Sequence, residues 1–399
     1  MNRRSESGAI ALQAAFLMAM FVALSALVVD QGMLIVARSE AQNAADAAAV
    51  AGAYARATVY EEPAMIATQA IAIARANHVW MEEPSIVPTD VKVETCQNPE
   101  PWWAEGDECV SATVHRTEAR MNKLPTVFAN FFDLDGQDVM ATATARVASA
   151  GMTDCMRPWA IPDRWIERSD EDGNPTGVWT QDSTYDTVYT SGAKKGQPLP
   201  APDIYIPPSK KSTGTGFSTA DYGRQLVLKE GRGSSLRAGW YGRVALPRAD
   251  GGGSPHSAKV YQDNIESCNG VTLKLGDEVM PLNGNVVGPT KHGVDKLMDD
   301  DPGAFWDKGK KRIRGGCMEK GDCAKSSRLV AVGVFDPNVY ESNSQSVVKI
   351  VNLVGFFIDQ IDDDSNVIGH LTYYPAIADK KAPDITGESS FLKAAVLAR

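Results

Sequence analysis

The chain has 399 residues, a net charge of −10 and a hydrophobic content of 43%, so it is long enough for a membrane anchor and one or two folded units. An acidic chain without a basic stripe that carries interleaved aromatic residues is not expected to bind nucleic acid. The five histidines are scattered, and H-E-x-x-H, G-x-S-x-G, Walker and dinucleotide motifs are absent. We therefore predict neither an enzyme nor a protein with a small-molecule substrate.

The N-terminal stretch 9–29 contains no charged residue. At about 1.5 Å per residue, a helix of this length just covers a hydrocarbon core of about 30 Å. We therefore predict a transmembrane helix over 9–29, preceded by a short N-terminus, 1–8, that carries Arg3 and Arg4. Because positive charge resists translocation, residues 1–8 should stay in the cytoplasm and the remaining chain should cross the membrane.

A secretory signal peptide is the alternative interpretation of the same residues. It would need a shorter apolar region followed by a small-residue cleavage site. Here the uncharged run ends at Asp30, apolar sequence resumes at 33–37, and helix-forming residues follow without a turn signal. These features favour an anchor that is kept, or that is trimmed only near its N-terminus.

The helix should continue to about Val59, because alanine, the best helix former, fills most positions from 41 to 57. Alanines at spacings of four, three and four residues form a stripe on one face: Ala44, Ala48, Ala51 and Ala55. Such a stripe lets another backbone approach closely. The sequence leaves open whether that backbone belongs to the protein's own sheet or to another subunit.

A small sheet is expected next. A second helix should run from Pro63 to about Val79, since proline suits a first helical turn. Alternating side chains then predict three strands, with a short helix over 124–132 before the third; the strands are 85–94, 109–117 and 139–148. Helices followed by a small antiparallel sheet define a pilin-like α+β unit over 30–150.

Residues 151–399 should form a larger β-rich domain, because most of the 34 glycines and 22 prolines lie there. The run VVKIVNLVGFFI is the most apolar stretch after the anchor, and we expect it in the centre of a sheet. Short helices are expected over 294–300 and 391–398. The candidate strands are 225–230, 240–245, 329–335, 346–358 and 367–374, the last two as a hairpin. The predicted fold class is therefore α+β.

Six cysteines lie beyond the span, and an even number on the oxidising side of a membrane suggests three disulfides. Cys317 and Cys323 enclose a short polar loop, and Cys96 and Cys109 flank a loop between paired strands. By elimination, Cys155 would pair with Cys268. This is one of fifteen pairings that six cysteines allow.

One acidic loop is a candidate calcium site. Asp133, Asp135 and Asp138 place oxygen ligands around a turn glycine, as loops that bind hard cations do. The twelfth position counted from Asp133 is Thr144, whereas a full EF-hand loop has a glutamate there. A solvated β-turn is the alternative, because turns favour the same residues. No other cofactor is predicted.

Trp102 and Trp103 lie on the loop between Cys96 and Cys109. Adjacent exposed tryptophans would suit a partner surface, since aromatic anchors dominate interface energies. Burial against the strand pair is the alternative, because tryptophan has a large apolar area to remove from water.

The segment VDQGMLIVARSEAQNAADAAAVAGA, with Asp30 and Gly32 at the end of the span, resembles the N-terminal region of the TadG-like (TadE/TadG) proteins of Flp (Tad) pilus assembly. Three further stretches, 155–165, 214–229 and 286–306, look like a subgroup of that family. The resemblance implies a single-pass inner-membrane protein with its body in the periplasm. It would help to build an adhesive pilus or form a minor part of one.

Two departures from the family pattern limit this resemblance. Larger relatives carry a von Willebrand factor A domain with a D-x-S-x-S metal site, and this sequence has no such motif. Prepilin-like relatives carry a glutamate five residues after the processing glycine. Here Gly8 is followed by Ala9, and the fifth position is Gln13, so cleavage between Gly8 and Ala9 departs from that pattern.

The sequence thus predicts a membrane-anchored structural or assembly protein of a Flp-type pilus. Its partners would be the inner membrane and other Tad pilus assembly proteins or pilins. One alternative is a calcium-dependent cell-envelope protein for ligand binding or adhesion. Another is a minor pilin at the pilus tip.

Overall fold

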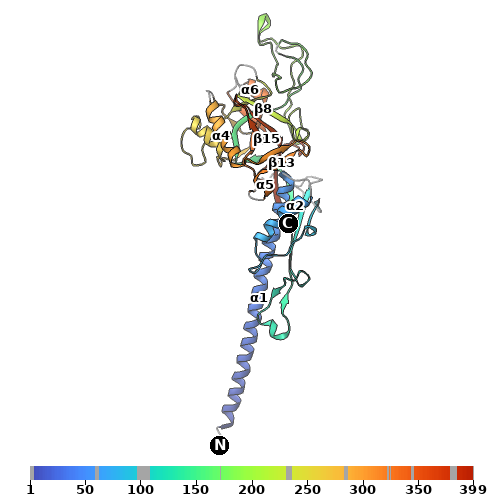
Figure 1. Ribbon diagram of the computed structural model, residues 1–399, viewed down its shortest axis with the longest axis vertical. Coiled ribbons are helices and arrows are strands. Elements are labelled where there is room, and N and C mark those ends of the chain that lie inside the picture. The colour runs from blue at the N-terminus through green and yellow to red at the C-terminus, as the bar shows by residue number, and fades with distance from the viewer. Residues whose placement is uncertain are drawn as a thin grey trace.

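The computed structural model describes residues 4–58, 63–96, 108–170, 172–230, 236–282, 286–320, 323, 325–342, 346–377 and 384–398. A long helix projects from a small sheet, and a larger β-rich body lies at the other end of the molecule (Figure 1). The mixed α+β class predicted from the sequence is consistent with this arrangement.

Helix α1 (Arg4–Thr58) is one continuous helix of 55 residues, which at about 1.5 Å per residue is about 80 Å long. No proline interrupts it. Its N-terminal half projects alone, whereas its C-terminal half lies against the first sheet and against helix α2 (Pro63–Ala76), which ends three residues before the predicted Val79.

The first sheet has the strand order β1-β2-β5-β18-β17. The pairs β1–β2, β2–β5 and β5–β18 are antiparallel, whereas β17 runs parallel to β18. The C-terminal strand of the chain therefore returns to the N-terminal sheet. The bounds are β1 (Val91–Thr95), β2 (Glu108–Arg116), β5 (Val139–Ser149), β17 (Tyr374–Pro375) and β18 (Leu392–Ala398).

The helix predicted over 391–398 is wrong, because Leu392–Ala398 is strand β18. Its alanines favour a helix in isolation. In the folded chain its backbone pairs with β5 over Lys393–Ala398, and its small side chains lie next to α1. Tertiary pairing therefore overrides the local preference.

The alanines of α1 pack against this sheet and α2. Ala44 and Ala48 are fully buried, and Ala55 is nearly so, in one cluster with Val110, Val114 and Ile66. At Gly52, an added Cβ would lie 2.7 Å from Cγ1 of Val110, so this close approach requires glycine. The sequence left open whether the alanine stripe packs against the protein's own sheet or against another subunit. In the structure these three alanines pack within the chain.

The helix predicted over 124–132 is also wrong. Leu124–Pro125 forms β3, which pairs with β4 (Gly136–Gln137), and only Ala129–Phe132 forms a 3₁₀ turn, η3. Pro125 lacks the N–H that a helix interior needs. Two further 3₁₀ turns, η1 (Pro88–Asp90) and η2 (Glu118–Arg120), lie in the same unit.

The larger body is built on a closed barrel of six strands in the order β15-β14-β7-β9-β8-β16, with β16 pairing back to β15. As expected, the apolar run lies in a central strand, β15, and forms an antiparallel hairpin with β16. The strands are β7 (Met156–Pro162), β8 (Gln225–Glu230), β9 (Trp240–Arg243), β14 (Leu329–Phe335), β15 (Val348–Ile361) and β16 (Val367–Thr372).

Two helices cover one side of this barrel. Tyr261 and Ile265 of α3 (Ala258–Glu266) and Leu297 of α4 (Val287–Asp300) share a core cluster with Val330 and Phe356 of the barrel. The sequence predicted only the end of α4 and missed α3. The shorter elements are β6 (Met152–Thr153), β10 (Leu273–Lys274), β11 (Glu278–Val279), β12 (Ala304–Asp307), β13 (Arg312–Gly315), α5 (Gly316–Lys320), α6 (Pro337–Ser342), η4 (Gly192–Lys194) and η5 (Thr219–Asp221).

An arm over 166–204 extends from the barrel at the end opposite α1, drawn in green in Figure 1. Isolated β-bridges join its two sides, from Ile166 with Ile204 to Val188 with Pro198.

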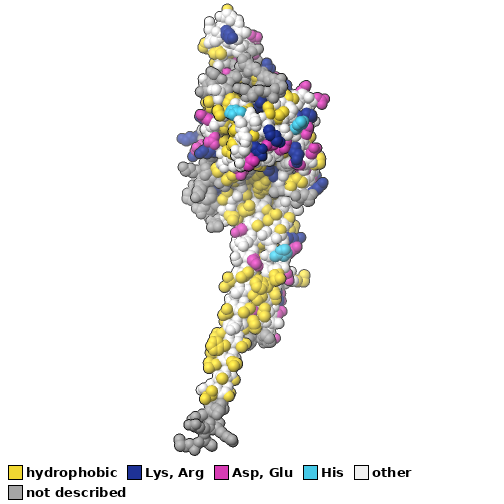
Figure 2. Space-filling view, turned by 90° about the vertical axis from the view of Figure 1, so that its left-hand side faces the viewer, with side chains coloured by type: hydrophobic (Ala, Val, Ile, Leu, Met, Phe, Trp, Pro, Cys, Tyr) yellow, Lys and Arg dark blue, Asp and Glu magenta, His cyan; other side chains and the backbone are white. Residues whose placement is uncertain are grey.

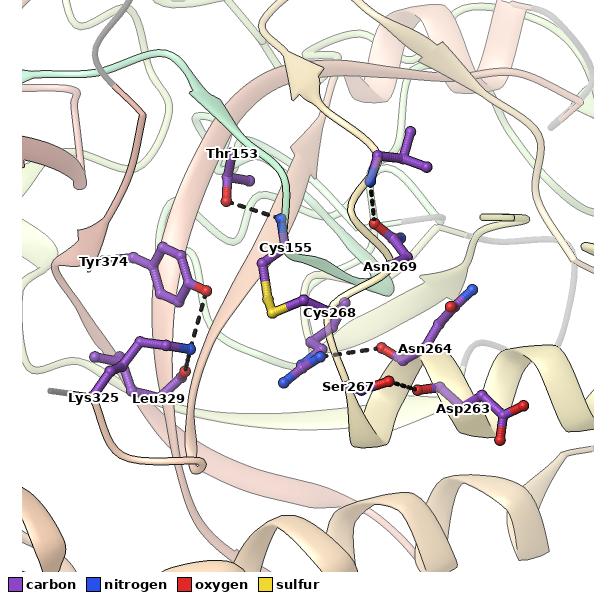
Figure 3. Close-up of a disulfide and its surroundings, with 12 residues drawn as sticks. Thr153, Cys155, Asp263, Asn264, Ser267, Cys268, Asn269, Lys325, Leu329 and Tyr374 are labelled. Atoms are coloured by element: carbon purple, nitrogen blue, oxygen red, sulfur yellow. Dashed lines mark hydrogen bonds between the residues drawn. A yellow bond between two sulfur atoms is a disulfide. The ribbon is translucent and has the colours of Figure 1, made fainter. Parts of the chain in front are cut away.

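Three disulfides join the six cysteines: Cys96 with Cys109, Cys155 with Cys268, and Cys317 with Cys323. The second joins the start of β7 to the end of α3 (Figure 3). Non-reducing peptide mapping is the measurement that tests this pairing.

Candidate membrane and partner interface

The N-terminal half of α1 has the properties of a membrane span. Among the described residues, one helix is long and apolar enough to cross a membrane, over Ile10–Ala57, and the most apolar part of it is not covered by the rest of the chain. Phe16, Met18 and Phe21 are each about two-thirds exposed or more. Figure 2 shows the resulting apolar surface along the lower part of the molecule. A helix presenting apolar side chains all round is typical of a membrane span.

The candidate processing site, Gly8 and Ala9, lies within the helical backbone of α1. The side chains of residues 1–9 lie outside what the structure describes. Cleavage between Gly8 and Ala9 therefore stays a prediction from the sequence.

Asp30 follows the span directly and is 6% exposed. Its carboxylate accepts hydrogen bonds from three successive backbone N–H groups, those of Val127 at 2.9 Å, Phe128 at 3.2 Å and Ala129 at 2.7 Å. These N–H groups lie at the start of η3. The first N–H groups of a helical turn have no partner within the turn, and here the Asp30 carboxylate supplies one. Asp30 thus fixes the turn between β3 and β4 against α1.

Burial of the Asp30 carboxyl raises its pKa, but the hydrogen bonds from Val127, Ala129 and Phe128 outweigh it and hold the pKa below its ordinary value. Asp30 is therefore ionised at neutral pH with its charge directed at backbone donors. The sequence identified Asp30 only as the residue that ends the uncharged run. Its partners lie 97 to 99 residues away, so no local pattern indicates this contact.

Apolar side chains are exposed where Asp30 holds this turn. Val127 is 51% exposed and Leu134 is 61% exposed. On α1, just beyond Asp30, Ile35 and Val36 are exposed as well. The apolar surface of the span thus continues past Asp30 onto the body, which the sequence analysis missed.

The three aspartates of the candidate calcium loop have separate surroundings. The Asp135 carboxylate contacts Nζ of Lys123 at 2.8 Å, which lowers the pKa of Asp135, whereas the Asp138 carboxylate accepts a hydrogen bond from the backbone N–H of Glu118 at 2.8 Å. Asp133 has a left-handed backbone at the end of η3. Among the described residues, no group of three or more His, Cys, Asp or Glu side chains is arranged to hold a metal ion.

We expect millimolar calcium to leave the melting temperature of the protein unchanged. A cation that binds the folded state raises this temperature in a concentration-dependent way, and here Lys123 already neutralises one of the carboxylates. Differential scanning fluorimetry with calcium, and with magnesium as the control, checks this. A rise that saturates with calcium but not with magnesium, and that is lost in Asp133→Asn, would instead support the calcium-dependent alternative.

The proposed partner surface at Trp102 and Trp103 lies outside the described residues, so it stays a prediction from the sequence. Among the described residues, the candidate interface consists of the bare half of α1 and the adjacent turn.

These features define a class: an α+β protein whose long helix presents a bare apolar half and fixes its other half on a folded sheet. Residues 8–56 match the family model described as putative Flp pilus-assembly TadE/G-like, so the resemblance seen in the sequence is confirmed for this segment. The match covers nearly all of α1. No curated protein and no solved structure matches the chain.

Proposed function

We propose that this protein is a membrane-anchored structural or assembly component of a Flp (Tad) type pilus that acts through protein contacts in the cell envelope. One observation carries the proposal: the family segment, 8–56, coincides with α1. Half of that helix is free to lie in a membrane, and the other half is built into the body. The protein would thus hold a large folded body at the membrane where the pilus is assembled.

The proposed topology is a single pass through the inner membrane, with 1–8 in the cytoplasm and the body in the periplasm. Arg3 and Arg4 before the span support this orientation. Three disulfides in the body support an oxidising compartment, since disulfides persist there.

The proposed division of the chain is 1–8, the span 9–29, the α+β unit 30–150 and the β-rich domain 151–399. Strand β18 of the last part pairs with β5 of the α+β unit. The sheet of the α+β unit is therefore completed only when the C-terminal strand is present.

A minor pilin at the pilus tip is the second candidate function. Joining a fibre would require extracting about twenty apolar side chains from lipid and burying them again against other subunits. The alanine stripe of α1 does not offer that contact, because Ala44, Ala48 and Ala55 are buried within the chain. We therefore favour an assembly protein that stays in the membrane.

In a strain that lacks the gene, we expect surface pili to be strongly reduced and to be restored by the full chain. The restored protein should lie in the membrane fraction with residues 1–8 intact, as measured by intact-mass analysis of membranes and sheared fibres. Normal piliation without the gene would contradict a role in assembly. A species that begins at Ala9 and is enriched in sheared fibres would establish the minor-pilin alternative.

A further inference from the structure

We propose that the turn between β3 and β4, residues 126–135, is a second membrane contact that lies on the phospholipid surface where α1 leaves the bilayer. This inference rests on the proposed function, because it requires α1 to span a membrane. The turn would contact the phospholipids at the boundary between their headgroups and acyl chains. Exposed apolar side chains can enter this boundary while neighbouring polar groups stay hydrated.

The position of the turn is fixed by Asp30. A span over 9–29 fills a hydrocarbon core of about 30 Å, so Asp30 lies at its edge. The backbone N–H groups of Val127 and Ala129 bind the Asp30 carboxylate at 2.9 and 2.7 Å, so the turn lies level with that edge. Figure 1 shows the turn between β3 and β4 reaching along α1 towards the N-terminal end of the helix.

The side chains of the turn suit this boundary. Val127 and Leu134 are both more than half exposed, and an apolar side chain gains free energy when it leaves water. Single exposed apolar residues are ordinary on protein surfaces. Here they adjoin an apolar span, because the backbone of Val127 to Ala129 is bound to Asp30 at the end of that span.

Two of the three carboxylates at the turn are paired, and the third, Asp133, is exposed beside Leu134, where it would lie among the hydrated headgroups. The Asp30 carboxylate is covered by three backbone donors, and the Asp135 carboxylate pairs with Lys123 at 2.8 Å. The headgroup region also accepts polar groups that the hydrocarbon core would exclude. The turn would thus fix the angle at which the body stands on the membrane, because it adds a second contact to a single helix.

A spin label can test this in the full chain. All six cysteines are in disulfides, so a single introduced cysteine is the only thiol that reacts with the label. Three variants are compared in vesicles of phosphatidylethanolamine and phosphatidylglycerol: Leu134→Cys in the turn, Leu17→Cys in the span, and Val178→Cys on the distant arm. Val178 is 68% exposed and serves as the matched control in water.

The measurement is the ratio of collisions with oxygen, which partitions into lipid, to collisions with a water-soluble nickel chelate. We expect this ratio to be highest at Leu17, lowest at Val178, and several-fold above the Val178 value at Leu134. A Leu134 label that matches Val178 would overturn the inference, and so would a label that neither reagent reaches, which would indicate a covering protein. Val127→Cys repeats the test if Leu134→Cys folds poorly.

The label at Leu17 separates the two proposals. If Leu17 reports lipid and Leu134 reports water, the anchor holds and only the second contact is refuted. If Leu17 itself reports water, the membrane anchoring in the proposed function fails as well.

Discussion

Replacing both Cys155 and Cys268 with alanine should lower the free energy of unfolding of the body by about 4–5 kcal/mol. The two cysteines are 113 residues apart in the sequence, and their crosslink joins the start of β7 to the end of α3. In the chain-entropy model, a crosslink over about a hundred residues restricts the unfolded chain far more than a short one does. Urea unfolding of the full chain in detergent, followed by tryptophan fluorescence, measures the loss.

The matched control is the pair Cys317 and Cys323, only six residues apart. The same model assigns such a short loop about 2 kcal/mol. Equal losses in the two double variants would contradict the entropic explanation. Peptide mapping of the unreduced protein first establishes that Cys155 and Cys268 are joined.

The parts of the fold that the sequence could predict are those with a strong local pattern. The uncharged run 9–29 and the alanine-rich stretch after it indicate one long helix, and α1 is continuous from Arg4 to Thr58. Strands β8 and β14 have the predicted bounds, because their apolar runs are short and end at turn residues.

The parts that could not be predicted depend on partners distant in the chain. Leu392–Ala398 has the composition of a helix, but β5, more than 240 residues earlier, turns it into a strand. The contact of Asp30 with Val127 spans 97 residues, and the sequence carries no signal for it. The pairings of β7 with β14 and of β8 with β16, which complete the barrel, also join strands far apart in the sequence, and side-chain alternation does not encode them.

Asp163 is a buried carboxylate whose position predicts a pH effect. It is fully buried directly after β7, and its Oδ1 accepts hydrogen bonds from the backbone N–H groups of Arg164 at 2.9 Å and Phe217 at 2.7 Å. The hydroxyl of Tyr205 donates to Oδ2 at 3.0 Å. At Gly216, an added Cβ would lie 2.2 Å from this carboxylate, so the segment passes directly over it. Asp163 therefore joins the base of the arm to the segment around Phe217.

Burial raises the pKa of Asp163 to about 7, although the hydrogen bonds from Phe217, Arg164 and Tyr205 act in the opposite direction. In the unfolded chain the same carboxyl has its ordinary pKa of 3.8. Between these two values the folded state binds more protons than the unfolded state, so the free energy of unfolding falls as pH rises. At about 1.4 kcal/mol per pKa unit, the stability lost through ionisation of Asp163 reaches about 4 kcal/mol near pH 7. At higher pH this loss is constant.

Asp163→Asn should remove this pH-dependent loss of stability. An asparagine oxygen can still accept from Arg164 and Phe217, and its amide can donate to the Tyr205 oxygen, but the side chain stays neutral at every pH. We expect the variant to match the wild type near pH 4 and to exceed its free energy of unfolding near pH 8 by up to about 4 kcal/mol. Burial also raises the pKa of Asp203, to about 6, so Asp203 adds the same pH dependence to the stability of both proteins. The difference in free energy of unfolding between variant and wild type therefore reports Asp163 alone. Urea unfolding at pH 4, 6 and 8 measures this difference, and an unchanged difference across the three values would show that Asp163 is ionised in the folded protein throughout.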